Sequence, residues 1–237
     1  PDYLVILDLE TTGLDPNKDY VIEIGAILYS VPCCCTLQQL STLLPVKENP
    51  VEKINKISAQ SSQLVDDYLI IIEQIERWIN KADYIVAHNA QFDQQWFGRD
   101  YLPSVDKKWL CTYDDFVWIK NTKPTSLINT VLNYGIGVNN AHRALTDCQL
   151  IAALFDRVSE LGDFTRILSE AIRRSEEDKL QVIAHVDYKN KDFVKQFDFK
   201  WNPHLKIWSK LIRQSDLDQE IDQYSFRISI SDVFNTS

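Results

Sequence analysis

Short apolar runs in the first half of the chain are typical of buried β-strands. Tyr3–Leu7 is continuously apolar, and Val21–Ser30 (VIEIGAILYS) is apolar at most of its positions. Thr36–Val46 follows a Pro-Cys turn and predicts a third strand, paired with the second as in a hairpin. Asp83–His88 (DYIVAH) predicts a short buried strand. We therefore expect a sheet that is built mainly from this part of the chain.

Helical periodicity of apolar residues appears between and after these runs, most clearly where apolar positions recur every three or four residues. The predicted helices and short elements are Leu64–Ile79, Gln91–Phe97, Trp109–Val117, Ser126–Tyr134, Leu145–Leu161 and Asp163–Arg174. The order is thus three strands, a helix, a strand and then mostly helix. This order predicts an α/β fold with a mixed central sheet.

A charged linker, Ser175–Lys179, precedes a second group of short elements. Their predicted order is strand, helix, hairpin and strand: Leu180–Tyr188, Asn190–Phe197, Phe199–Trp201 with Ile207–Leu211, and Tyr224–Ile230. We therefore predict a first domain over residues 1–175 and a small α/β accessory domain over residues 180–237. With about 58 residues, the second domain is near the lower limit for independent stability.

Composition places the chain among ordinary soluble globular proteins, with 45% hydrophobic and 25% charged residues. No apolar run reaches the ~20 residues that cross a bilayer, and the start, PDYLV, has no signal-peptide pattern. The five cysteines show no C-x-x-C spacing, which fits a reducing compartment. We therefore expect a cytoplasmic protein without a membrane partner. The net charge of −9 argues against a surface broadly coated by nucleic acid, but it allows local binding of phosphates through metal ions.

Two carboxylates stand at the end of the first apolar run. Asp8 and Glu10 are two residues apart, so in a strand their side chains point to the same face. Neighbouring acids at the end of a buried strand repel each other, and a divalent cation is the usual agent that offsets this repulsion. A strand end with solvated acids is the alternative, and a D-x-E pattern alone does not decide between the two.

Three further residues change that balance. Asp93 lies in HNAQFD, where a predicted strand passes into a helix, and His142 and Asp147 lie in AHRALTD, where another helix begins. Such junctions are where an open α/β sheet places its ligands. Four carboxylates and one histidine there predict a site for two divalent cations, and oxygen ligands favour Mg²⁺ or Mn²⁺ over zinc. Taken singly, each residue could instead be a helix cap or a solvated loop residue.

The motifs D-x-E-T-T-G, N-A-x-F-D and H-R-A-x-x-D, in this order, closely resemble those of the DEDDh family of 3′–5′ exonucleases. This family includes proofreading subunits of bacterial replicases, oligoribonuclease and DNA repair nucleases. The resemblance covers residues 3–160. It implies a ribonuclease H-like exonuclease fold and a phosphodiester hydrolase that releases 5′-mononucleotides from single-stranded 3′ ends of DNA or RNA.

The resemblance also implies a role for each residue that matches the family motifs. Asp8 is expected to bridge two metal ions, and Glu10 and Asp147 to bind the ion that holds the attacking water. Asp93 is expected to hold the second ion. His142 corresponds to the general base, which fits the ordinary pKa of imidazole near ~6.5.

Around these residues, the resemblance implies a pocket for the terminal nucleotides. Thr11, Thr12 and Leu14 are expected to line it, with Leu14 against a base. Asn89 and Phe92 are expected to support Asp93, with Phe92 near the penultimate base. The alternative is a plain turn with Leu14 in the core.

The segment Phe197–Lys210 (FDFKWNPHLKIWSK) combines basic and aromatic residues. It weakly resembles the W-x-P-x-x-K-x-W hairpin of HARP-type modules attached to DNA-remodelling proteins. Aromatic rings can stack on bases while lysines meet phosphates; alternatively, the tryptophans form the core of a small domain and the lysines its solvated face. The residues concerned are Lys200, Trp201, Lys206, Trp208 and Lys210.

Three functional hypotheses remain at this point. The first is a stand-alone 3′–5′ exonuclease, and the second is a proofreading subunit bound to a polymerase or another repair protein. The third is a nucleic-acid-binding module with a decayed site. Because all four acids and the histidine are present, we favour an active enzyme. The preference for DNA or RNA, the pathway and the oligomeric state do not follow from these residues.

Overall fold

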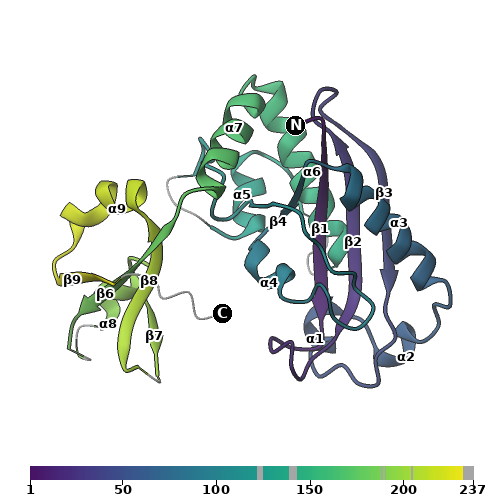
Figure 1. Ribbon diagram of the computed structural model, residues 1–237, viewed down its shortest axis with the longest axis horizontal. Helices are drawn as coiled ribbons and strands as arrows, with labels where there is room; N and C mark the ends of the chain where they lie inside the picture. The colour runs from purple at the N-terminus through teal and green to yellow at the C-terminus, as the bar shows by residue number, and fades with distance from the viewer. Residues whose placement is uncertain (122–124, 139–142, 188, 190, 204, 232–237) are drawn as a thin grey trace. The chain divides into compact units, whose positions relative to one another are not determined.

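The structure is a computed structural model that describes residues 1–121, 125–138, 143–187, 189, 191–203 and 205–231. It divides into two compact units, Pro1–Ser175 and Glu176–Ser237. Among the described helices, none has the length and hydropathy that a membrane span needs. Figure 1 shows the elements of both units, which are described here one at a time.

The first unit is built on a five-stranded sheet, ordered β3-β2-β1-β4-β5 (Figure 1). Its strands are β1 (Tyr3–Thr11), β2 (Val21–Ser30), β3 (Cys35–Leu43), β4 (Tyr84–Ala87) and β5 (Trp109–Cys111). The first three strands are antiparallel neighbours, whereas β1–β4 and β4–β5 pair in parallel. The mixed sheet predicted from the sequence is therefore confirmed.

Helices cover both faces of this sheet. The longer ones are α3 (Tyr68–Lys81), α6 (Ala144–Glu160) and α7 (Phe164–Ser175), and the shorter ones are α1 (Glu52–Asn55), α2 (Ala59–Ser62), α4 (Ala90–Gln94) and α5 (Leu127–Asn133). The sequence pattern did not predict α1 and α2, because a single turn is too short to show a helical period. One apolar core joins the sheet to α3, and another joins the opposite face to α5, α6 and α7.

Strand alternation in β1 decides on which side the acids lie. Leu4 and Ile6 belong to the core shared with α5, α6 and α7, whereas Leu7 belongs to the core shared with α3. Because side chains along a strand alternate between the faces, Asp8 and Glu10 continue the side of Leu4 and Ile6. The two acids therefore point toward the face that α6 covers.

The second unit has a four-stranded antiparallel sheet, ordered β7-β8-β6-β9. Its elements are β6 (Lys179–His185), α8 (Lys191–Lys195), β7 (Lys200–Asn202), β8 (Ile207–Arg213), α9 (Gln214–Glu220), the 3₁₀ turn η2 (Ile221–Gln223) and β9 (Arg227–Ser231). Helix α9 was missed from the sequence because it buries only Leu217 and shows no apolar stripe. The four strands and α8 match the predicted strand, helix, hairpin and strand, and η2 was not predicted.

Candidate active site

The end of β1 presents the first two acids beside β2. In the antiparallel register, Asp8 lies opposite Gly25 and Glu10 lies opposite Glu23. The register shifts between Glu10 and Thr11, so the ladder becomes irregular directly after the second acid. The acids therefore occupy the last regular part of the strand, where the backbone is held by β2.

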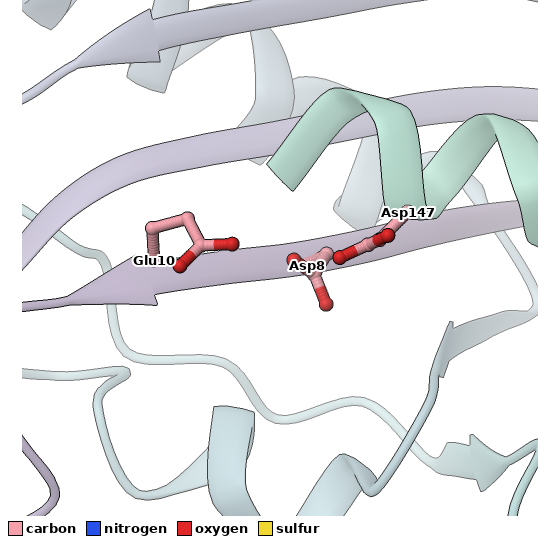
Figure 2. A group of neighbouring side chains, drawn as sticks. All are labelled: Asp8, Glu10 and Asp147. Atoms are coloured by element: carbon pink, nitrogen blue, oxygen red, sulfur yellow. The ribbon is translucent and has the colours of Figure 1, made fainter. Parts of the chain in front are cut away.

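Helix α6 brings the third acid to this strand end. It begins at Ala144 and carries Asp147 in its first turn. One carboxylate oxygen from each of Asp8, Glu10 and Asp147 lies within 4.8 Å of the others (Figure 2). Figure 2 shows Asp8 and Glu10 on β1 and Asp147 on the helix above them. Two acids of β1 and one acid of α6, more than a hundred positions later, thus form one cluster of carboxylates.

Burial and repulsion between the acids of this cluster raise the pKa of their carboxyl groups. Burial raises the pKa of Asp8 well above its ordinary value, and the negative charges of Asp93 and Asp147 raise it further. Burial also raises the pKa of Glu10 to about 7, with added repulsion from Asp147 and Glu23. Burial and mutual repulsion therefore disfavour the fully ionised form of the cluster. A divalent cation stabilises the fully ionised carboxylates instead.

Asp93 reaches the same region from α4, which follows β4 after a tight turn. Asn89 forms this turn with a φ of 66°, in the left-handed region that asparagine tolerates better than most residues. Asp93 is 2% exposed, and burial raises its pKa well above the ordinary value. Its charge raises the pKa of Asp8, although Asp93 is not a member of the three-acid cluster. Asp93 therefore lies near the cluster, as a separate acid on the side of α4.

The predicted general base, His142, lies outside the described residues. The description of this part of the chain resumes at Arg143, which directly precedes α6. The structure therefore places the residue after the histidine, and the role of His142 stays a prediction.

The turn after β1 is held by its own hydrogen bonds. The Thr11 hydroxyl donates to the Gly13 carbonyl at 2.6 Å. The Thr12 N–H donates to the Tyr20 carbonyl at 2.8 Å, and the Thr12 hydroxyl accepts from the Tyr20 N–H at 2.9 Å. Leu14 is 80% exposed, so the alternative that places it in the core is wrong. The turn is thus held by hydrogen bonds and exposes the apolar side chain of Leu14 to solvent.

The two residues expected to support Asp93 differ in their surroundings. Phe92 is half-buried and packs edge-on against Trp96, with ring centroids 5.9 Å apart. Asn89 is exposed, and its side chain makes no capping hydrogen bond to α4. Asn89 therefore contributes to the position of Asp93 through its backbone conformation. Their proposed contacts with a substrate stay predictions.

The basic and aromatic residues of the second unit fall into two groups. Lys200 and Lys206 are exposed, and Trp201 is 43% exposed. Trp208 is 6% exposed and belongs to the core of the unit. The prediction that Trp208 stacks on bases is therefore corrected, because a buried ring offers no free face.

The prediction that Lys210 contacts nucleic acid is also corrected. Its side chain is only 9% exposed, and its ammonium group lies 4.9 Å from the centre of the Phe199 ring. The same group donates to the Phe197 carbonyl at 3.0 Å and pairs with the Glu220 carboxylate. These partners occupy the charge of Lys210 inside the unit, so it is not placed to meet a phosphate backbone.

Two buried polar residues, Glu23 and Asn55, were not singled out from the sequence. Glu23 on β2 is 2% exposed and pairs with Arg143. Asn55, 1% exposed, donates from its side chain to the Thr11 carbonyl at 3.4 Å. A charged residue inside the apolar run of β2 was the available signal for Glu23. Asn55 gave no comparable signal, since asparagine is common in loops.

The comparison with known families shows to which family the chain belongs. The profile of the RNase_T exonuclease family matches residues 5–155. The chain belongs to this exonuclease family. The match spans the three acids of the cluster and Asp93, and the motifs that contain them are those of its DEDDh group. The family uses divalent metal ions, which agrees with a donor set made only of carboxylates.

Individual relatives of this exonuclease chain are bacterial DNA polymerase III proteins. DNA polymerase III subunit epsilon of Treponema pallidum is 31% identical over 160 residues, which cover 62% of the chain and 72% of that protein. DNA polymerase III PolC-type of Thermotoga maritima is 29% identical over 163 residues, which cover 66% of the chain but only 12% of the polymerase. The chain thus spans a small part of the large PolC-type relatives.

Among solved structures, the exonuclease is similar to the nuclease domain of 3′hExo, described as a DEDDh family member bound to rAMP. The TM-score is 0.54 and the identity is 18%, over 69% of this chain and 94% of that one. This likeness shows that the two share a fold. The ribonuclease H-like exonuclease fold expected for the first unit is therefore confirmed.

Proposed function

We propose that this chain is a metal-dependent 3′–5′ exonuclease, which hydrolyses phosphodiester bonds at single-stranded 3′ ends and releases 5′-mononucleotides. The observation that carries the proposal is the convergence of Asp8, Glu10 and Asp147 within 4.8 Å, with Asp93 nearby. Membership of the exonuclease family supports the same reaction class.

The carboxylates hold the cations in this proposal. Asp8, Glu10, Asp93 and Asp147 would hold the Mg²⁺ or Mn²⁺ ions, with Asp8, Glu10 and Asp147 close enough to share one of them. When bound, such a pair of cations clamps the scissile phosphate, lowers the pKa of the attacking water and neutralises the departing 3′-oxygen. Burial and repulsion from neighbouring acids raise the pKa of Asp8, and that of Glu10 to about 7, which supports the proposal because a positive partner would favour the ionised carboxylates.

His142 is the proposed general base. A neutral imidazole can accept the proton of the attacking water. The position of Arg143, which directly follows His142 and is anchored to β2, supports this assignment because it fixes the chain next to the three-acid cluster.

The turn after β1 is the proposed binding site of the 3′-terminal nucleotide. Thr11 and Thr12 are held by hydrogen bonds within the turn, and Leu14 is free to press against a base. A rigid turn next to the acids can hold the terminal sugar and phosphate in register with them. Asn89 and Phe92 stay proposed contacts for the next nucleotide.

A role as a proofreading component is the second candidate function. It is favoured by the epsilon-type and PolC-type relatives, which are parts of polymerases. In that case a DNA polymerase or another repair protein is the partner. A decayed, purely nucleic-acid-binding module is disfavoured because Asp8, Glu10, Asp93 and Asp147 are all present.

The second unit is proposed to be an accessory domain that binds nucleic acid or a partner. Lys200, Trp201 and Lys206 support this proposal, since all three are exposed. A cytoplasmic setting also stays a prediction, supported by five cysteines that are free thiols in the structure.

The deciding experiment follows the shortening of 5′-labelled single-stranded DNA and RNA with Mg²⁺ or Mn²⁺. We expect a ladder from the 3′ end with the wild type and its loss with Asp8→Ala. Glu160→Ala is the matched control, because Glu160 is an exposed acid at the far end of α6 and pairs with Arg157. No ladder with the wild type, or equal activity of Asp8→Ala, would show that the proposed function is wrong.

A further inference from the structure

An ion pair between the buried Glu23 and the partly exposed Arg143 connects β2 to the beginning of α6. The Glu23 carboxylate accepts hydrogen bonds from Arg143, at 3.0 and 3.1 Å from Nε and 2.7 Å from Nη2. It also accepts from the backbone N–H of Ala144 at 3.0 Å. Arg143 and Ala144 are the last residue before α6 and its first residue. One carboxylate therefore binds both the side chain and the backbone at the helix start.

Gly25 provides the space for this contact. A Cβ atom at Gly25 would lie 2.4 Å from the Leu145 nitrogen and 2.5 Å from the Ala144 carbonyl carbon. Real Cβ atoms do not approach backbone this closely, so only glycine allows the first turn of α6 to rest on β2. The Cys148 thiol donates to the Gly25 carbonyl at 3.4 Å, one turn further along. Glu23 and Gly25 together form a seat for the first turn of α6.

This seat lies directly beside the proposed metal ligands. In the β1–β2 register, Glu23 faces Glu10 and Gly25 faces Asp8. Asp147, in the same first turn as Ala144, supplies the third carboxylate of the cluster. The first turn of α6, which carries Asp147, therefore contacts the two β2 residues that lie opposite Glu10 and Asp8.

The negative charge of Glu23 is energetically unfavourable beside the other acids. Its negative charge adds to the repulsion that raises the pKa of both Asp8 and Glu10. An apolar side chain could fill the same space without that repulsion. The Glu23 carboxylate instead accepts several hydrogen bonds from the Arg143 guanidinium group. Such paired hydrogen bonds fix the orientation of the two groups as well as the distance between them.

We infer that Glu23 is a positioning residue, which clamps Arg143 and the first turn of α6 and thereby sets Asp147 at metal-binding distance from Asp8 and Glu10. The inference rests on the proposed function, because it assigns Glu23 a role toward the same cations. Glu23 acts through Arg143 and Ala144 and is not itself a ligand. The clamp also fixes the chain immediately after His142.

The test measures Mn²⁺ binding to the full chain by electron paramagnetic resonance, comparing the wild type with Glu23→Gln. We expect about 10-fold weaker binding in the variant, in line with the loss of an outer partner of a metal ligand. In steady-state assays, kcat at low Mn²⁺ should fall and recover at saturating Mn²⁺, while KM for the oligonucleotide stays within about 2-fold. A purely structural role would lower the Tm without changing the metal dependence.

Tyr29→Phe is the matched control. The Tyr29 hydroxyl donates to the Asp156 carboxylate at 2.7 Å, so it also joins β2 to α6, but near the other end of the helix. We expect this variant to lower the Tm and leave Mn²⁺ binding within about 2-fold of the wild type. If Glu23→Gln does not fold, Arg143→Gln provides the same test, because the Arg143 side chain is 45% exposed.

The outcomes separate the two proposals. If the wild type binds Mn²⁺ and degrades DNA, but Glu23→Gln binds Mn²⁺ unchanged, the positioning role is wrong and the proposed function stands. If the wild type neither binds Mn²⁺ nor degrades any single strand, the proposed function is wrong and the positioning role falls with it. Equal weakening by Tyr29→Phe would also overturn the inference, since the effect would then belong to the whole β2–α6 contact.

Discussion

Glu10 lies opposite Glu23 across the β1–β2 ladder, and the two carboxylates have different partners. Glu23 is bound by the Arg143 side chain and the Ala144 backbone. Glu10 faces Asp147 instead, and burial together with that charge raises its pKa to about 7. Two glutamates on neighbouring strands thus have different surroundings: Glu23 is hydrogen-bonded to the start of α6, and Glu10 belongs to the three-acid cluster.

The stability of the metal-free protein should depend on pH in the direction set by these acids. The ordinary pKa of Glu10 is 4.5 and the folded value is about 7, so between these values the native state binds more protons than the unfolded state. Stability therefore falls as pH rises from about 4.5 to about 7. Calorimetry in EDTA should show a lower Tm at pH 7.5 than at pH 5, for the transition of the first unit.

Added Mg²⁺ should reverse this loss, because a cation that binds only the ionised native site stabilises it by mass action. Asp8→Asn is the control and should flatten the pH dependence. A Tm that rises steadily from pH 5 to pH 7.5 in EDTA would contradict the assignment of the raised pKa of Glu10.

Asp147→Asn should separate stability from activity. Removing the Asp147 charge lowers the pKa of Glu10 and relieves repulsion, so the metal-free variant should have a higher Tm than the wild type at pH 7.5. Activity should fall by more than the ~10–100-fold that loss of an outer partner of a metal ligand costs. Parallel thermal unfolding and exonuclease assays check both effects, and a variant that is less stable and equally active would contradict the cluster's role.

Leu14→Ala should affect substrate binding and leave the fold intact. Leu14 is 80% exposed, so truncation should change the free energy of unfolding by less than about 0.5 kcal/mol. If Leu14 packs against the terminal base, KM for a single-stranded oligonucleotide should rise several-fold, since each apolar CH₂ group removed from such a contact costs about 0.8 kcal/mol. Leu161→Ala, at an exposed leucine that directly follows α6, is the control and should leave KM unchanged.

Lys210→Met and Lys200→Ala should affect different properties of the second unit, namely stability and binding. Lys210→Met removes the buried partner of Glu220 and should destabilise the unit by about 2 kcal/mol. Lys200→Ala alters an exposed side chain, so it should leave the Tm unchanged and weaken binding to long single strands if the unit contacts nucleic acid. Fluorescence anisotropy with a labelled oligonucleotide measures the binding. Unchanged affinity in Lys200→Ala and Lys206→Ala would argue for a partner other than nucleic acid.

Much of the first unit was predictable from local pattern. The apolar run that ends in Asp8 and Glu10 predicted both the strand and the common face of the two acids, since strand alternation is a local property. The helix that carries Asp147 followed from its apolar period. In the second unit the same reasoning predicted the strands and missed α9, whose first turns are almost entirely polar.

The sequence by itself determined the acids, their order and the faces on which they lie, because these depend on the geometry of neighbouring residues. Only the tertiary structure decided what each charge meets. It paired Glu23 with Arg143, 120 positions later, and enclosed Lys210 among Phe199, Tyr224 and Glu220. The physical reason is that the fate of a charged side chain depends on burial and partners from distant elements, and no local pattern along the chain carries that information.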